Sequence, residues 1–125
     1  LCTIGDSTFT HSGMTGLLGA IKADADMTVF VLDNATVAMT GGQATLAAGE
    51  DLLELLRGLG VNDEHLHVIE PLAKNHARNV EVIAREINHR GLSVVVAQRP
   101  CIQIPKPKKS KSQEKQPAAA NADAD

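Results

Sequence analysis

Four runs of apolar residues divide the first hundred positions of the sequence. The two longest do not alternate between apolar and polar residues, which is typical of strands that are covered on both faces, as in parallel sheets. The two shorter runs are bounded by Gly, Asp or Pro, which often end a strand. The pattern therefore predicts four strands, at Leu1–Ile4, Met27–Leu32, Leu66–Ile69 and Leu92–Ala97.

Three of the segments between or beside these runs have features of helices, namely Ser12–Ala23, Glu50–Leu59 and Asn75–Asn88. Glu50–Leu59 begins with acidic residues and ends near glycines, as the helix dipole and the C-cap favour. The third segment places its charges opposite one apolar face, which consists of Val80, Ile83, Ala84 and Ile87. Asn34–Gly49 has little periodicity, and we predict a long loop with room for a short helical piece.

The alternation of strands and helices predicts the fold class. Strand–helix–strand units cross over with a right hand, and their helices cover both faces of a parallel sheet. We therefore expect an α/β fold of three layers, α/β/α, with a mostly parallel sheet. This domain spans residues 1–104.

Residues 105–125 differ from the rest of the chain in composition. They contain no Val, Leu, Ile or Phe, and five Lys stand against three acidic residues. A segment without core-forming side chains cannot bury enough surface to offset its ordering entropy. We predict a disordered tail rich in Lys, Pro and Ala, and a basic arm that docks on an acidic partner is the alternative.

Composition excludes several function classes. The net charge of −3 and the aromatic content of 2% argue against nucleic-acid binding. No apolar stretch approaches the roughly 20 residues of a membrane span, and no secretion signal opens the sequence, so we expect a cytoplasmic protein without membrane contact. The chain opens at Leu1 and not at Met, which suggests a fragment or a processed piece.

Cysteines and histidines offer few ligands for a metal. Cys2 and Cys101 form neither a disulfide framework nor a zinc pattern, and we expect buried thiols. His65 and His67 share one strand face and could hold a metal, but no third ligand is in view, so we expect them to face solvent. His76 and His89 accompany a charge-rich helix and are expected to be exposed.

The most unusual chemistry follows the first two predicted strands. Gly5-Asp6-Ser7 ends the first strand, and Asp33-Asn34 ends the second. Parallel sheets bind ligands outside the carboxyl ends of their strands. Carboxylate and amide oxygens suit Mg²⁺, and the start of a helix after Ser7 suits an anion. We interpret these residues as a binding site for a diphosphate that is bridged by a metal ion. The alternative is that Asp6, Ser7 and Asn34 only cap turns, as these residue types often do.

These residues also resemble a known motif. GDSTFTHSG (5–13) and LDNATVAMTGGQ (32–43) are similar to the thiamine-diphosphate motif, in which GDG or GDS precedes an Asn by somewhat under thirty residues. Together with VVVAQRPC (94–101), they resemble the thiamine-diphosphate domain of the alpha subunits of indolepyruvate ferredoxin oxidoreductases, within the 2-oxoacid:ferredoxin oxidoreductase family. The resemblance covers about residues 1–104 and implies a thiamine-diphosphate-binding fold.

The resemblance also implies a role for each matching residue. Mg²⁺ would be held by the side chains of Asp6 and Asn34 and by the backbone carbonyl of Thr36. Residues near the reacting part of the cofactor and the substrate would be His11, Met39 and Thr40. The complete cofactor-binding set would be Gly5, Asp6, Ser7, Thr8, His11, Asn34, Thr36, Met39, Thr40 and Gly41.

The activity implied by the resemblance is the oxidative decarboxylation of indolepyruvate or other arylpyruvates to acyl-CoA, with electrons passed to ferredoxin. Pyruvate-using relatives resemble SNTGGQ where this chain reads AMTGGQ, so Met39 suits a bulkier aryl substrate. The iron–sulfur clusters, a pyrimidine-binding domain and a cluster-bearing, gamma-type subunit would lie outside this chain. A non-oxidative 2-oxoacid decarboxylase and a non-catalytic binding or assembly module are the alternatives.

Overall fold

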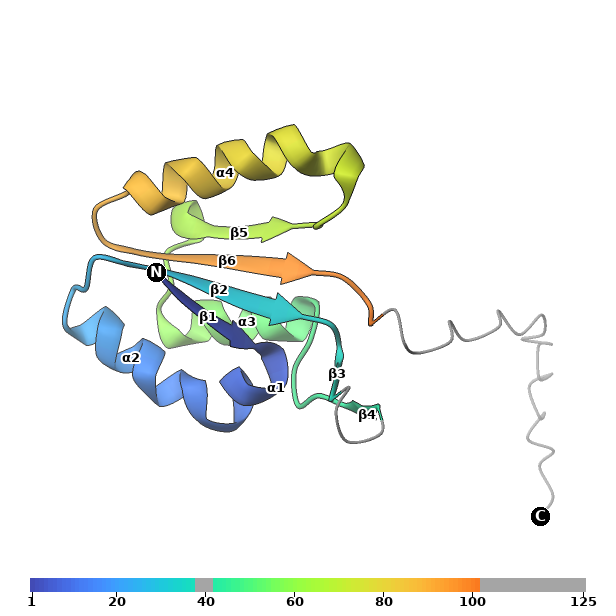
Figure 1. Ribbon diagram of the computed structural model, residues 1–125. Helices are drawn as coiled ribbons and strands as arrows, with labels where there is room; N and C mark the ends of the chain where they lie inside the picture. The colour runs from blue at the N-terminus through green and yellow to red at the C-terminus, as the bar shows by residue number, and fades with distance from the viewer. Residues whose placement is uncertain (38–41, 102–125) are drawn as a thin grey trace, which may run out of the picture.

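The computed structural model describes residues 1–37 and 42–101. Four strands of this part form one parallel sheet in the order β1–β2–β6–β5 (Figure 1). They are β1 (Cys2–Gly5), β2 (Met27–Asp33), β5 (Leu66–Ile69) and β6 (Leu92–Gln98). The four predicted strands and the parallel sheet are confirmed, and the ends differ by one residue at most.

Helices cover both faces of the sheet, as predicted. α2 (Met14–Lys22) and α3 (Glu50–Leu59) lie on one face, and α4 (His76–Asn88) lies on the other (Figure 1). Short 3₁₀ turns, Asp63–His65 and Ala73–Asn75, precede β5 and α4. The three-layer α/β/α fold is therefore confirmed.

The first helical segment begins earlier than the predicted Ser12. α1 (Asp6–Thr8) follows β1 directly, and a π-helical turn, Phe9–Gly13, joins it to α2. A Cβ at Gly13 would lie 2.7 Å from the side-chain carbon Cδ1 of Ile4 and 3.1 Å from Cδ2 of Phe9, so the helical run packs closely against β1 at this glycine. This close packing fixes the helical run directly behind the end of β1.

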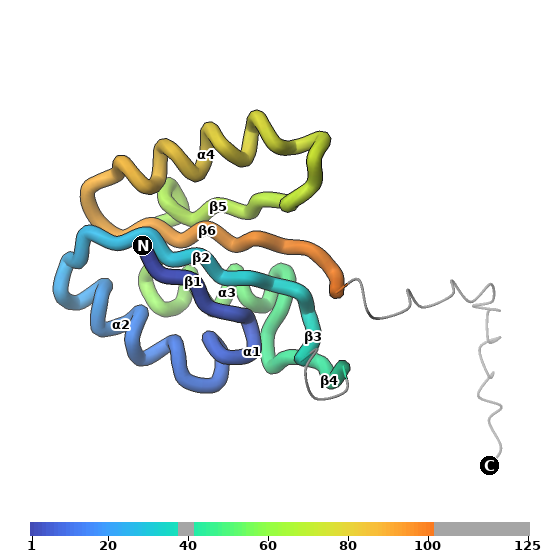
Figure 2. Tube along the Cα trace, viewed as in Figure 1, coloured from blue at the N-terminus to red at the C-terminus, as the bar shows by residue number. Residues whose placement is uncertain are grey.

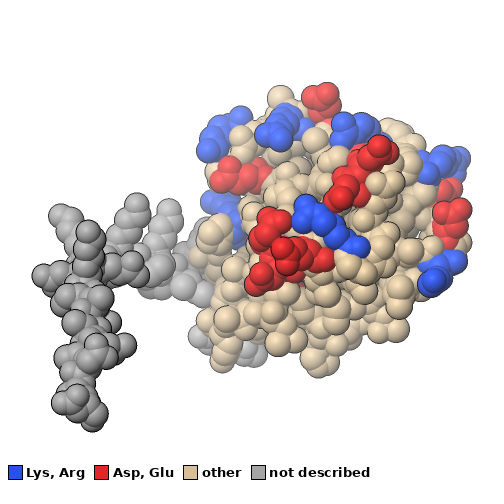
Figure 3. All heavy atoms as spheres, turned by 180° about the vertical axis from the view of Figure 1, so that it is seen from behind, with Lys and Arg blue, Asp and Glu red and all other residues tan. Residues whose placement is uncertain are grey.

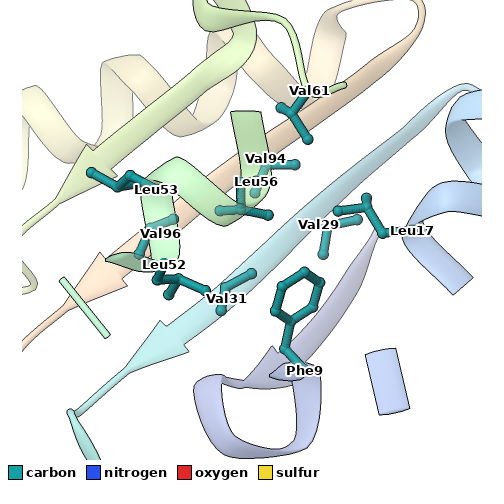
Figure 4. Close-up of a cluster of buried hydrophobic side chains, with 10 residues drawn as sticks. All are labelled: Phe9, Leu17, Val29, Val31, Leu52, Leu53, Leu56, Val61, Val94 and Val96. Carbon is teal, nitrogen blue, oxygen red and sulfur yellow. The ribbon is translucent and has the colours of Figure 1, made fainter. Parts of the chain in front are cut away.

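The hydrophobic core lies between the sheet and the layer formed by α2 and α3 (Figure 4). Valines of β2 and β6 point into it from the sheet, and leucines of α2 and α3 meet them. Phe9, on the π-helical turn, is 1% exposed and packs in the same cluster. Its burial anchors the segment that follows Asp6.

The prediction for the buried face of α4 is wrong. Val80 and Ile87 are about half exposed, whereas Glu86 is fully buried. The carboxylate of Glu86 is compensated by His65 Nδ1 at 2.9 Å, His67 Nε2 at 2.8 Å and Arg85 Nε at 2.8 Å. Burial alone raises the pKa of Glu86, but hydrogen bonds from Arg85 and His65, with the charge of His67, lower it to about 2.

This cluster also corrects the prediction for the histidines. His65 and His67 do not face solvent freely, because both contact the buried carboxylate of Glu86. The ring of His89 stacks on that of His65 with centroids 3.6 Å apart, so His89 is half-buried rather than exposed. His76 is exposed, as expected.

Cys2 is exposed, contrary to the prediction of a buried thiol. It lies on β1, which is at the edge of the sheet and pairs with β2 alone. Cys101 is half-buried. An apolar sequence neighbourhood did not ensure burial, because the strand lies at the border of the sheet.

The segment predicted as a long loop contains two short strands. β3 (Thr36–Val37) and β4 (Gln43–Ala44) pair in an antiparallel manner, and the described part of Asn34–Gly49 contains no helix. Thr36 Oγ1 donates a hydrogen bond to the backbone oxygen of Gln43 at 3.1 Å. This contact brings the segment back beside the end of β2.

Acidic and basic side chains are interspersed on the face of the molecule shown in Figure 3. Among the helices of the described residues, none is long and apolar enough to cross a membrane. The predicted disordered tail, 105–125, and the domain boundary at residue 104 lie outside the described residues.

Candidate functional site

The carboxyl ends of β1 and β2 lie side by side, because the two strands pair in parallel up to Gly5 and Leu32. Figure 2 shows both ends at the same edge of the sheet, with β3 and β4 beside them. Asp6 and Asn34, which follow these ends, are therefore brought together, as the sequence predicted.

Asp6 connects the two strand ends through its carboxylate. Its side chain is buried, with 3% of the residue exposed. The backbone N–H of Ser7 donates to Oδ1 at 2.7 Å, and that of Ala35 donates to Oδ2 at 3.0 Å. The second bond spans 29 positions of sequence and holds the turn after β2 against the start of α1.

The turn after β2 is closed by Asn34. Its Oδ1 accepts a hydrogen bond from the N–H of Thr36 at 3.0 Å, as in an Asx turn. Ala35, between them, has a φ of +59°, in the left-handed region that residues other than glycine rarely adopt. Thr36 is buried and continues into β3. The two side chains predicted to face a metal thus lie at the two sides of one strained, hydrogen-bonded turn.

Asp33, the last residue of β2, is also 3% exposed. Its Oδ1 accepts from the N–H of Ala35 at 3.0 Å. Its Oδ2 accepts from the N–H of Gly49 at 2.8 Å and from Gln98 Nε2 at 2.9 Å. The sequence suggested only that Asp33 adds a carboxylate to this edge, whereas the structure shows that the carboxylate joins three separate segments.

The two aspartates place two negative groups close together in the interior. Both accept from the same N–H, that of Ala35. Burial raises the pKa of Asp6 above its ordinary value, the charge of Asp33 raises it further, and the N–H groups of Ser7 and Ala35 oppose the rise. The ion pairs found among the described residues involve neither carboxylate. A cation at this edge would relieve the repulsion between them.

The donor set at this edge fits a magnesium ion with a diphosphate. Mg²⁺ takes oxygen ligands, and proteins typically supply one or two carboxylates and leave the other positions to phosphate and water. Asp6 and Asn34 offer oxygens of these kinds from neighbouring strand ends. A Cβ built at Gly5 would meet no heavy atom within 4 Å, so there is open space against the backbone just before Asp6.

The remaining predicted residues fall into two groups. Ser7 is half-buried beside Asp6, whereas Thr8 and His11 are exposed on the helical turns that follow. Met39, Thr40 and Gly41 lie outside the described residues. The structure therefore brings together Gly5, Asp6, Ser7, Asn34 and Thr36, and it places His11 on the adjoining π-helical turn.

Two residues of this edge were not predicted from the sequence. Gly49 and Gln98 both donate to Asp33, across 16 and 65 positions of sequence. A donor at such a distance carries no local signal. The start of a helix directly after Gly49 could be predicted from the sequence, but the contact of Gly49 with Asp33 could not.

Comparison with known proteins agrees with this geometry. A family model described as the C-terminal TPP binding domain of thiamine pyrophosphate enzymes matches residues 1–97. This range includes all the residues described above at the carboxyl edge of the sheet, except Gln98.

Curated relatives give a similar result. A protein of Archaeoglobus fulgidus named indolepyruvate oxidoreductase subunit IorA is 38% identical over 111 residues, which cover 81% of this chain and 17% of that protein. Proteins of the same name from Methanothermobacter thermautotrophicus and Pyrococcus horikoshii are 34% and 33% identical, over 79% and 81% of this chain. The chain spans only 16–17% of the length of these relatives.

Proposed function

The chain belongs to the family of thiamine pyrophosphate enzymes, as their C-terminal TPP binding domain, and from this premise we propose that it holds the Mg²⁺–diphosphate end of thiamine diphosphate in a 2-oxoacid oxidoreductase. The observation that carries the proposal is the buried carboxylate of Asp6, which is bonded to the turn that bears Asn34. A buried carboxylate that forms no ion pair with any described residue and lies beside open backbone is the arrangement that a bound cation stabilises.

In this proposal the chain binds and orients the cofactor. Asp6 and Asn34 supply side-chain oxygens to Mg²⁺, and Thr36 supplies its backbone carbonyl. Gly5, Ser7 and Thr8 adjoin the diphosphate. Because Asp6 is buried, a metal held by it would have little water on the protein side, and its attraction for the diphosphate would be stronger for that reason.

A second group of residues belongs near the reacting end of the cofactor. When bound, thiamine diphosphate supplies a nucleophilic carbon for attack on the keto group of a 2-oxoacid. We assign His11, Met39, Thr40 and Gly41 to this region, and His11, Met39 and Thr40 to contact with the substrate. The exposure of His11 beside the carboxyl edge leaves its side chain accessible to a ligand.

The substrate and partners of the whole enzyme follow from the relatives. These are named as subunits of indolepyruvate oxidoreductase, which supports an oxidoreductase over the non-oxidative decarboxylase and over a non-catalytic module. We propose indolepyruvate or another arylpyruvate as substrate, CoA as acyl acceptor and ferredoxin as electron acceptor. The pyrimidine-binding domain and the iron–sulfur clusters, with a gamma-type subunit, are assigned to other segments or partner chains.

The assembled enzyme provides the test. Reduction of a viologen dye should depend on indolepyruvate, on thiamine diphosphate and on Mg²⁺, and removal of Mg²⁺ with a chelator should abolish it reversibly. Calorimetry should show that Asp6→Ala removes Mg²⁺-dependent binding of thiamine diphosphate, because a charged ligand to the metal is lost. The matched control is Asp24→Asn, because Asp24 is an exposed aspartate that precedes the amino end of β2, whereas the proposed site lies at the carboxyl end. Unchanged affinity in Asp6→Ala, or turnover without the cofactor, would contradict the proposal.

A further inference from the structure

Asp33 lies where three segments of the chain meet at the carboxyl edge. Its Oδ1 holds the N–H of Ala35, in the turn between β2 and β3. Its Oδ2 holds the N–H of Gly49, which directly precedes α3, and the side-chain amide of Gln98, the last residue of β6. Its backbone oxygen also accepts from the N–H of Arg99 at 2.9 Å. One buried side chain thus ties the turn to both neighbouring elements.

Two of these contacts hold backbone conformations that are unfavourable by themselves. Ala35 has a φ of +59°, and Gly49 has a φ of +58° with a ψ of −129°. Alanine rarely adopts the first conformation, and essentially only glycine adopts the second. Such conformations persist where surrounding contacts determine them, and here Asp33 accepts a hydrogen bond from both residues.

We propose that Asp33 is a positioning residue for the Mg²⁺–diphosphate site. It does not ligate the metal but fixes the turn on which Asn34 and Thr36 lie, relative to Asp6. This inference rests on the proposed function and adds to it a residue that acts through the turn. The contacts support this role over direct ligation, because Asp33 accepts three hydrogen bonds, two of them from Gly49 and Gln98 outside the turn, whereas both donors to Asp6 are backbone groups of the proposed site itself.

The geometry also explains how the effect would reach the metal. Ala35 N–H bridges Oδ1 of Asp33 and Oδ2 of Asp6. A shift of the turn therefore displaces Asn34 and Thr36 and loosens the contact of Ala35 with Asp6 at the same time. Groups that orient metal ligands in this way typically change metal affinity by roughly 10- to 100-fold when they are replaced.

The main test is Asp33→Asn in the assembled enzyme. Asn has a single acceptor oxygen, so it can satisfy either Ala35 or the pair of donors from Gly49 and Gln98, but not all three. We expect the Mg²⁺ concentration for half-maximal activity to rise roughly 10- to 100-fold. The kcat at saturating Mg²⁺ and thiamine diphosphate should stay within about two-fold, because bound metal draws the turn back into place.

A second readout requires no cofactor. Hydrogen exchange, followed by mass spectrometry on the cofactor-free enzyme, should be faster at the amides of Ala35 and Gly49 in Asp33→Asn. Asp24→Asn is the control for the change of charge. Gln98→Met removes one donor to Asp33 without altering charge, and we expect the half-saturating Mg²⁺ concentration to rise several-fold.

Each outcome decides between explanations. Wild-type Mg²⁺ affinity and wild-type amide exchange in Asp33→Asn would overturn the proposal. Weakened Mg²⁺ binding with unchanged exchange at Gly49 and Ala35 would also overturn it, since Asp33 would then act by charge or as a ligand. If the wild-type enzyme bound no thiamine diphosphate, the proposed function would fail, while the exchange rates would still show whether Asp33 holds the turn.

Discussion

Replacing Asp6 by Asn removes one of two buried negative charges at the carboxyl edge and keeps the size of the side chain. Ala35 N lies 3.0 Å from an oxygen of Asp6 and 3.0 Å from an oxygen of Asp33, so these two oxygens are at most about 6 Å apart. Two unit charges at this separation repel by about 3 kcal/mol at an effective dielectric constant of 20. This repulsion is absent in the variant.

The substitution also has a cost. Asn offers one oxygen where Asp6 offers two, so the hydrogen bond from the N–H of either Ser7 or Ala35 to this side chain is lost. Loss of a hydrogen bond to a charged group costs about 1.5–3 kcal/mol. The two effects offset each other, and we expect Asp6→Asn to destabilise the cofactor-free fold by no more than about 1 kcal/mol. Binding of Mg²⁺ and thiamine diphosphate should nevertheless be lost.

Native-state hydrogen exchange of β2 in the cofactor-free, assembled enzyme gives the unfolding free energy of this segment. Calorimetry on the same preparation gives the cofactor affinity. A residue kept for the fold would lose stability on replacement, whereas one kept for a ligand loses affinity alone. A destabilisation of more than about 2 kcal/mol, or retained affinity for the cofactor, would refute the reasoning.

Three further predictions concern other parts of the chain. Glu86→Gln should lower stability at neutral pH by about 3 kcal/mol, because the pKa of Glu86 is about 2 in the fold and 4.5 ordinarily. That contribution is complete above pH 4.5 and is lost as the pH falls toward 2, so the stability curves of variant and wild type should converge in acid, and parallel curves would contradict it. Truncation after Ile104 should change the unfolding free energy by less than about 0.5 kcal/mol, and a large loss in melting temperature would show that the tail packs. The isolated 125-residue chain should show no 2-oxoacid turnover with saturating cofactor, since the pyrimidine-binding part is assigned elsewhere, and decarboxylation by the chain alone would contradict this.

The strands, and the position of Asp6 and Asn34 at one edge of the sheet, could be predicted because their signals are local. Each strand is a short apolar run, and Asp6 and Asn34 directly follow two of them. Pairing of β1 with β2 in parallel then brings both residues to one edge. Knowledge of the fold class was enough to place these side chains together.

The contacts of Asp33 and Glu86 could not be predicted in this way. Asp33 meets Gly49 and Gln98 across 16 and 65 positions, and Glu86 meets His65 across 21. Helical periodicity favours the burial of an apolar stripe, and it contains no information on a charged side chain that is buried because partners from another part of the chain compensate its charge. The prediction of the buried face of α4 was wrong, and the donors to Asp33 were missed, for this same reason.

A structure of the assembled enzyme with Mg²⁺ and thiamine diphosphate bound tests the central claim most directly. It should show Mg²⁺ about 2.0–2.1 Å from a carboxylate oxygen of Asp6 and from Asn34 Oδ1, with the diphosphate completing its ligands. Asp33 should still hold Gly49 and Gln98. A metal and diphosphate bound elsewhere, with Asp6 and Asn34 outside the coordination sphere, would contradict the account.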